Sequence, residues 1–227
     1  LALVAVLTTS AAPLLLGEAA PPGAFEEVPD YWRDAIGFID DNGTGRRTLL
    51  LPAAAWGEYE WGRPLDEPLQ ALAQDPWAVR NIVPLGGLGV TRWMDGIEAL
   101  LTTGQRSPGL AALLRRAGVE WVLVRNDLDQ RRSSPPSPTH VRRVLEQSPG
   151  LSRAGAWGPS VADPLDRRRL APELASPTDL QALELYRVEG AVEPVAVRPA
   201  SDLVVAAGAP ESTLGLIDAG VIDDEPL

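Results

Sequence analysis

The sequence contains no cysteine and no lysine, and His140 is its only histidine. Without cysteine, this chain has no disulfide, no thiolate zinc site and no cysteine nucleophile. One histidine cannot build a zinc site with histidine partners, so we expect a surface or helix-capping role for His140 rather than a catalytic one. A Gly-x-Ser-x-Gly elbow is also missing, which removes the nucleophile of an α/β-hydrolase. We therefore assign no metal ligand, and we predict no cofactor.

Positive charge is also scarce, because 20 basic residues stand against 31 acidic ones and the net charge is -11. An acidic chain of this kind has no general attraction to nucleic acid, so we predict no nucleic-acid partner. The glycines of the segment 86–89 follow a proline and do not form a strand-to-helix turn. We therefore do not expect a phosphate-binding loop there.

The sequence begins with an apolar run, LALVAVLTTSAAPLLL, from Leu1 to Leu16. It is too short to cross a bilayer alone, and no basic region precedes it as in a signal peptide. A buried core helix is a second alternative, weakened by the polar residues and the proline of the run. We favour the end of a transmembrane helix over residues 1–16, followed by a linker over residues 17–28.

Residues 29–132 show the pattern of a layered α/β domain. Apolar residues at helical spacing follow Asp30, an expected N-cap, and Asn42-Gly43 is an expected stop. Ser107 is the expected N-cap of a later helix that Gly118 closes, and the polar segment Arg125–Asp127 is an expected loop. We predict a Rossmann-like layer with buried strands at Thr48–Leu51 and Val119–Val124 and short helices at Leu69–Gln74, Trp77–Ile82 and Arg92–Leu101.

Residues 133–227 follow a Ser/Pro-rich break and predict a C-terminal α+β part that packs on or extends the same domain. Its strands alternate well enough to be antiparallel, which makes this a mainly-β extension. A polar stretch, 163–179, is expected to be a surface excursion. The expected helices are Thr139–Gln147 and Glu211–Ala219, and the expected strands are Leu151–Trp157, Leu183–Val188, Val192–Val197 and Leu203–Ala207.

The most informative segment is WGEYEWGRPLDEP, where aromatic rings stand beside carboxylates and an arginine. Ring faces bind the apolar side of a sugar and charged groups bind its hydroxyls, so we predict a glycan-binding site. One alternative is that these aromatics pack against the α/β layer while the arginine pairs with Asp66 or Glu67. A glycosidase carboxylate pair is a weaker alternative. The predicted substrate-binding residues are Trp56, Glu58, Tyr59, Trp61, Arg63, Asp66 and Glu67.

Several runs together resemble the membrane α-(1→3)-arabinofuranosyltransferases of actinobacterial cell-wall synthesis. They are FEEVPDYWRDAIGFIDDNG, RRTLLLP, WGEYEWGRPLDEPLQALAQDPWAVRNIVPLG, SPGLAALLRRAGVEWVLVRNDLD, LELYRV and PESTLGLIDAG. The resemblance covers most of Phe25 to Gly220. It implies a multi-pass GT-C enzyme that transfers arabinofuranose from decaprenyl-phosphate-arabinose to arabinan at the outer face of the plasma membrane.

In that family the catalytic carboxylate lies in an early extracytoplasmic loop, and no residue of this sequence corresponds to it. The resemblance therefore implies an extracytoplasmic segment that follows the transmembrane core, with no catalytic residue of its own. Two alternatives remain open. The chain could be a non-catalytic carbohydrate-binding or scaffold module of a cell-envelope protein, or it could be a soluble glycoside hydrolase.

Overall fold

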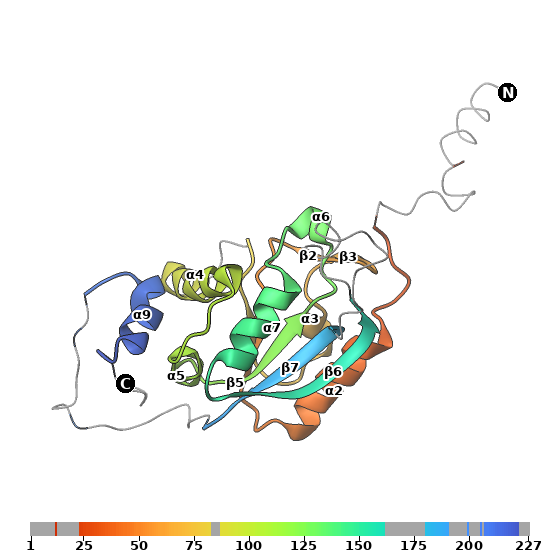
Figure 1. Ribbon diagram of the computed structural model, residues 1–227. Helices are drawn as coiled ribbons and strands as arrows, with labels where there is room; N and C mark the ends of the chain where they lie inside the picture. Colours follow the sequence, from red (N-terminus) through yellow and green to blue (C-terminus); the bar gives the residue numbers. More distant parts are fainter. Residues whose placement is uncertain are drawn as a thin grey trace, which may run out of the picture.

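The computed structural model describes residues 23–82, 87–161, 180–190 and 207–222, together with residues 12, 199 and 205. The centre of the fold is a five-stranded sheet in the order β4-β1-β5-β7-β6 (Figure 1). The first three strands are parallel, while β7 is antiparallel to both β5 and β6. The strands are β1 (Arg47–Leu51), β4 (Trp77–Val79), β5 (Val119–Arg125), β6 (Leu151–Ser160) and β7 (Gln181–Val188).

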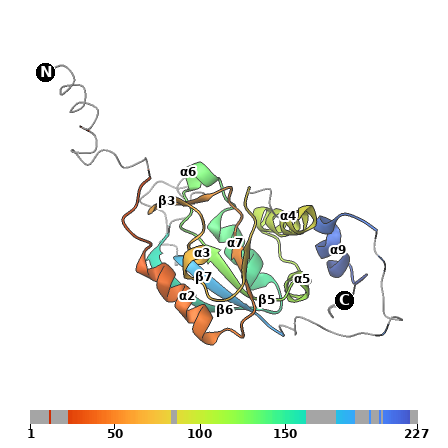
Figure 2. The same ribbon diagram turned by 180° about the vertical axis from the view of Figure 1, so that it is seen from behind.

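Helices cover both faces of this sheet, which confirms the α/β class with a mixed sheet (Figures 1 and 2). A separate two-stranded hairpin, β2 (Gly57–Tyr59) and β3 (Gly62–Leu65), lies beyond the end of β1. The helices are α2 (Asp30–Asn42), α3 (Pro68–Leu72), α4 (Leu88–Thr103), α5 (Leu110–Arg116), α6 (Gln130–Ser133), α7 (Pro138–Gln147), the 3-10 turn η2 (Pro210–Ser212) and α9 (Thr213–Asp218).

The side chains of β1 and β5 alternate between two hydrophobic cores. Leu49 and Val122 point into a core formed with α4, α5, α7 and α9. Leu50 and Leu123 point into the opposite core, which α2, α3 and the hairpin complete. Because both faces of these strands are covered, their sequences are continuous apolar runs rather than alternating ones.

Helix α4 lies across the sheet rather than along its strands (Figures 1 and 2). Val90, in its first turn, lies with Arg47 and Val119 near the amino ends of β1 and β5. Glu98, two turns later, accepts a hydrogen bond from Ala53, just beyond the carboxyl end of β1. In a βαβ unit the crossover helix instead packs along the strands and returns the chain to their amino edge. The Rossmann-like form of the layer is therefore not confirmed.

Several predicted elements are confirmed with shifted ends, and three local predictions are wrong. Trp77–Val79 forms the edge strand β4 rather than a helix, because it pairs with β1. Asp30 is the first residue of α2 and Pro29 its N-cap. Ser107 does not cap α5, which begins after Gly109; its hydroxyl binds Asp218 instead.

Other predictions concern residues that the structure does not describe. The predicted membrane helix at 1–16 lies outside the described residues apart from Ala12, and so does most of the linker. The excursion at 163–179 and the strand Val192–Val197 also lie outside them, as do residues 203, 204 and 206 of the last predicted strand. Within the described ranges, no helix has the length and apolar character needed to span a bilayer.

Candidate functional site

Polar side chains gather at the edge of the sheet where the parallel strands end. Pro52 follows β1, Arg80 follows β4, and Arg125 to Asp127 close β5. The chain passes from β1 to β4 on one side and then returns to β5 on the other, so its direction reverses between β1 and β5. In open α/β sheets, ligands bind in the crevice outside the carboxyl ends of strands at such a reversal.

The β2–β3 hairpin covers this crevice. Backbone hydrogen bonds join Glu60 N to Asp127 O (2.9 Å) and Asp129 N to Glu58 O (3.0 Å), so the hairpin is tied to the chain that leaves β5. At Gly57 an added Cβ would lie 2.3 Å from the carbonyl oxygen of Asp66, so only glycine allows the first strand of the hairpin to approach the end of the second this closely. The backbone hydrogen bonds hold the hairpin against the sheet edge, and Gly57 lets its two strands lie close together.

A buried ion pair fills the crevice beneath the hairpin. The side chain of Arg125 is 0% exposed and pairs with Glu67, which in turn accepts a hydrogen bond from the Tyr59 hydroxyl. The same guanidinium donates to Tyr59 Oη (3.1 Å) and to the carbonyl oxygen of Pro52 (3.0 Å). Burial raises the pKa of Tyr59 well above its ordinary value, so this hydroxyl stays a donor. The place where a ligand would enter is occupied by the protein's own groups.

Asp127 forms a second buried polar centre beside this pair. Its Oδ2 atom accepts hydrogen bonds from Tyr31 Oη (2.8 Å), Trp32 Nε1 (3.0 Å) and Trp61 Nε1 (3.1 Å). Burial raises the pKa of the Asp127 carboxyl to about 6, although these three donors act in the opposite direction. One carboxylate therefore joins α2, β5 and the hairpin.

Three ionisable groups lie on the outer side of the same edge. Arg80 Nε donates to Asp95 Oδ1 at 2.8 Å, and both side chains are partly exposed. Glu98 Oε1 accepts from the backbone N–H of Ala53 at 2.7 Å. Burial raises the pKa of Glu98 to about 7, against the opposing effects of that hydrogen bond and of nearby arginines.

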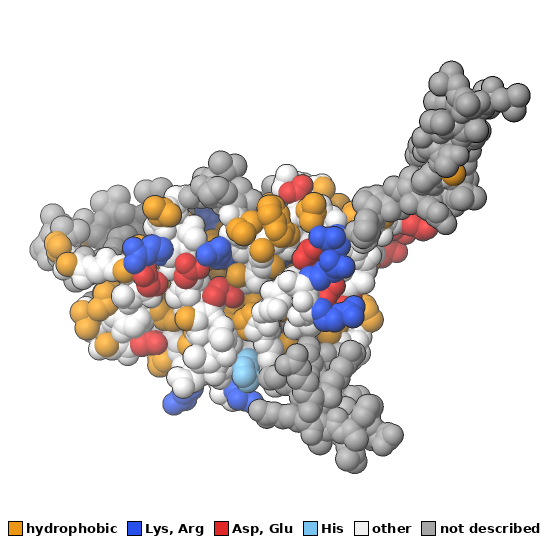
Figure 3. Space-filling model, turned by 90° about the horizontal axis from the view of Figure 1, so that it is seen from above, with side chains coloured by type: hydrophobic (Ala, Val, Ile, Leu, Met, Phe, Trp, Pro, Cys, Tyr) orange, Lys and Arg blue, Asp and Glu red, His pale blue; other side chains and the backbone are white. Residues whose placement is uncertain are grey.

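The structure separates the predicted substrate-binding residues into an outer and an inner group. Trp56 is 46% exposed, Asp66 is exposed, and Trp61 and Arg63 are half-buried. Glu58, Tyr59 and Glu67 are buried. Arg63 pairs with Glu58 at 2.7 Å, within the hairpin. Figure 3, which looks down on the hairpin side, shows hydrophobic side chains gathered between acidic and basic groups.

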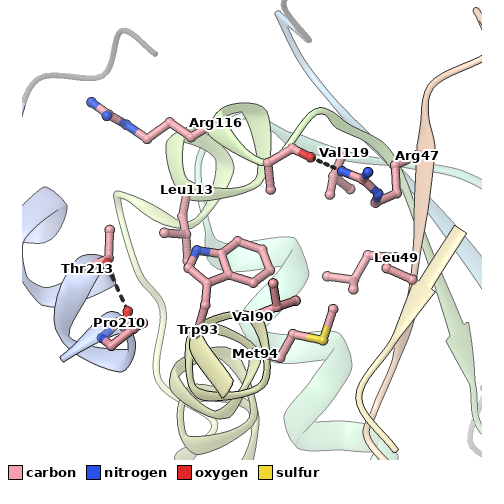
Figure 4. A pocket seen from close by; sticks show the side chains of 13 residues that line it. Arg47, Leu49, Val90, Trp93, Met94, Leu113, Arg116, Val119, Pro210 and Thr213 are labelled. Carbon is pink, nitrogen blue, oxygen red and sulfur yellow. Dashed lines mark hydrogen bonds between the residues drawn. The ribbon is translucent and has the colours of Figure 1, made fainter. Parts of the chain in front are cut away.

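A cavity of about 600 Å³ lies at the other end of the sheet, between β1, α4, α5 and η2. Figure 4 shows the Trp93 indole projecting into it beside Leu113 and Val90, while the Arg116 side chain points away. Arg47 at its rim donates a hydrogen bond to the carbonyl oxygen of Ala117. The lining is largely apolar, and none of these residues had been predicted to form a site.

Gly87, Gly89 and His140 lie at or within helices. Gly87 is the N-cap of α4 and Gly89 lies in its first turn, while Gly86 lies outside the described residues. His140 is half-buried in α7, where an added Cβ on Gly104 would lie 3.0 Å from its ring. Among the described residues, no group of three or more His, Asp or Glu side chains is arranged to hold a metal ion.

Comparison with known proteins identifies the relatives of this chain. The family model described as alpha-(1→3)-arabinofuranosyltransferase, N-terminal GT-C domain, matches residues 1–227. The chain belongs to this family. It is 36% identical over 217 residues to an alpha-(1→3)-arabinofuranosyltransferase of Mycolicibacterium smegmatis, and 35% identical over 221 residues to that of Mycobacterium tuberculosis.

A solved structure agrees with this assignment. The cryo-EM structure of the arabinofuranosyltransferase AftD from Mycobacteria matches 96% of this chain with a TM-score of 0.79 and 32% sequence identity. The chain covers 17% of that structure and 15% of the length of the two curated relatives. The fold is therefore shared with one part of a much longer transferase.

Sequence patterns predicted the hairpin as a site but not the buried residues that hold it in place. Arg125 and Asp127 had been assigned to a polar loop, yet Arg125 is the last residue of β5 and both are buried. A signal was available, because charged residues directly after an apolar parallel strand lie at the edge where sites form. Asp95 and Glu98 carried no such signal, since charges on one side of a helix usually face solvent.

Proposed function

We propose that this chain contributes to the extracytoplasmic part of a membrane glycosyltransferase that transfers arabinofuranose from decaprenyl-phosphate-arabinose to cell-wall arabinan. The described residues act as a scaffold, and the outer face of the β2–β3 hairpin contacts the acceptor glycan. The residues that catalyse the transfer lie outside this chain. Family membership and the likeness to AftD support the reaction class.

One observation carries the scaffold role: the crevice at the carboxyl ends of β1 and β5 is filled by Arg125, Glu67 and Tyr59. Breaking a buried ion pair to admit a substrate would leave an uncompensated charge. We therefore propose that Glu58, Tyr59 and Glu67 position the hairpin, and that Trp56, Trp61, Arg63 and Asp66 face the glycan. This divides the predicted site into supporting and contacting residues.

The proposed organisation keeps the end of a transmembrane helix at 1–16, a linker at 17–28, an α/β domain at 29–132 and a C-terminal part at 133–227. Family membership supports a membrane-attached module, and we propose that it lies at the outer face of the plasma membrane. Strands β6 and β7 extend the sheet begun by β4, β1 and β5, which supports a C-terminal part continuous with the α/β domain.

Steady-state kinetics of the full-length enzyme with decaprenyl-phosphate-arabinose and a synthetic arabinofuranose acceptor test this function. Trp56→Ala should raise the acceptor KM about tenfold and leave the donor KM unchanged, because the ring contacts only the acceptor. Val221→Ala, which shortens an exposed side chain beyond α9, is the matched control and should change neither. Unchanged acceptor KM in Trp56→Ala would exclude the glycan contact, and absence of transfer by the parent enzyme would favour a non-catalytic module.

A further inference from the structure

The loop that carries Trp56 is bonded to two other elements at the edge of the sheet. Ala55 O accepts a hydrogen bond from Ile82 N (3.3 Å), which holds the chain after β4 against the chain after β1. Ala53 N donates to Glu98 on α4. Trp56 and Ile82 are both large apolar residues, and they are 46% and 53% exposed. The exposed Trp56 therefore follows, within three residues, the backbone groups that bind Glu98 and the chain after β4.

Glu98 is held in place but has capacity for a further hydrogen bond. Its Oε1 atom accepts from Ala53, and within the described part of the chain its second carboxyl oxygen neither receives a hydrogen bond nor is fully buried. Burial raises the pKa of this carboxyl to about 7, so near neutral pH both protonation states are populated. Such a group can accept a hydrogen bond from a ligand hydroxyl when ionised and donate one to it when protonated.

The charges of this surface favour a neutral ligand. Arg80 is already paired with Asp95 at 2.8 Å, so its charge is balanced locally. A phosphate or carboxylate ligand would require a cation with no such partner. A sugar needs a ring face, an apolar wall and several groups that exchange hydrogen bonds with hydroxyls. Trp56, Ile82 and the three ionisable groups supply this combination.

We propose that Arg80, Asp95 and Glu98, together with Trp56 and Ile82, form a hydroxyl-binding subsite for one furanose residue of the acceptor glycan. This subsite rests on the proposed function, because it takes the same acceptor. It extends the contact surface away from the hairpin to the carboxyl ends of β1 and β4. Helix α4 makes this possible, because its packing brings residues 95 and 98 to that edge.

The test is the acceptor KM of the full-length enzyme, measured with a synthetic oligosaccharide of α-linked arabinofuranose. Glu98→Gln keeps an oxygen for the Ala53 N–H but changes the group offered to the ligand. Asp95→Asn makes the same change at a partly exposed position, and Glu189→Gln is the matched control on the exposed turn after β7. We expect the first two variants to raise the acceptor KM about fivefold to tenfold with kcat unchanged, as for the loss of one hydrogen bond.

The outcomes separate this subsite from the proposed function. If Trp56→Ala raises the acceptor KM while Glu98→Gln and Asp95→Asn behave like Glu189→Gln, the subsite is wrong and the glycan contact stands. If all four variants match the parent enzyme, both are wrong. Should Glu98→Gln lower the melting temperature, Asp95→Asn alone decides, because its partly exposed side chain takes part only in a surface ion pair that contributes little to stability.

Discussion

The two ends of the parallel strands have opposite characters. At the carboxyl ends, Arg125, Glu67 and Asp127 fill the space beneath the hairpin with paired polar groups. At the amino ends, an apolar cavity of about 600 Å³ remains open around Trp93. The end where open α/β sheets hold their ligands is therefore closed, and the hollow end carries few polar groups.

The two ends of the sheet also differ in how strongly their packing is fixed. The ion pair of Arg125 with Glu67 and the three hydrogen bonds to Asp127 Oδ2 hold these side chains in one arrangement, although Asp127 Oδ1 is buried without a hydrogen-bond partner. An apolar cavity has no such bonds, and its walls lose only packing contacts. The carboxyl end is suited to hold a binding surface in a fixed position, whereas the amino end tolerates change.

The largest expected effect is the loss of the buried ion pair. Arg125→Met leaves Glu67 charged and buried, so we expect the free energy of unfolding of the chain to fall by about 3–5 kcal/mol. Arg92→Met, which removes the surface pair with Glu211, is the matched control and should cost far less. Urea unfolding followed by circular dichroism measures both. Equal losses would show that the carboxyl end is not specially stabilised.

The next effect is a dependence of stability on pH. The folded pKa of Asp127, about 6, lies above its ordinary value of 3.8, so the unfolded carboxyl ionises first. The free energy of unfolding should therefore fall by roughly 2–3 kcal/mol as the pH rises from about 4 to about 6, and then level off. Glu98 should add a decrease of the same sign that extends to about pH 7.

Asp127→Asn isolates the first contribution. Unfolding free energies of this variant between pH 4 and pH 8 should keep only the decrease that Glu98 causes, since residue 127 no longer titrates. A pH profile identical to that of the parent chain would show that Asp127 does not titrate in this range.

The smallest expected effect is the difference in stability loss when the same substitution is made at each end of the sheet. Ala54→Val adds volume to the packed core next to the hairpin, so we expect a loss of about 1–3 kcal/mol. Ala78→Val adds the same volume at the wall of the cavity and should stay within about 0.5 kcal/mol of the parent. Differential scanning calorimetry of the two variants would show this difference. The reverse order would mean that the cavity is not open.

Local sequence patterns predicted the elements whose buried residues are set by neighbouring residues in the sequence. The apolar face of α2 is visible from its helical period, and β1 and β5 are visible as short apolar runs bounded by Gly, Pro and polar residues. The strand β4 does not, since three residues follow either structure until pairing with Thr48 to Leu50 selects the strand. Ser107 failed as a cap for the same reason: its partner, Asp218, lies 111 residues away.

The sequence located the candidate site but could not tell which of its side chains are buried and which are exposed. Glycine and proline interrupt the alternation of the hairpin, so its period does not tell which side chains face inward. Burial of Glu58 and Glu67 depends on Arg63 and Arg125, and only the second is distant in sequence. Placing Glu98 at the site required knowing how α4 packs on the sheet, which no local pattern contains.

Hydrogen–deuterium exchange of the full-length enzyme with and without an arabinofuranose oligosaccharide tests the contrast between the two ends most directly. We predict slower exchange on ligand addition in residues 53–57 and 80–82, at the carboxyl end, and no change in residues 88–94 or 113–119, around the cavity. Protection around the cavity with none at residues 53–57 would contradict the assignment of glycan binding to the closed end of the sheet.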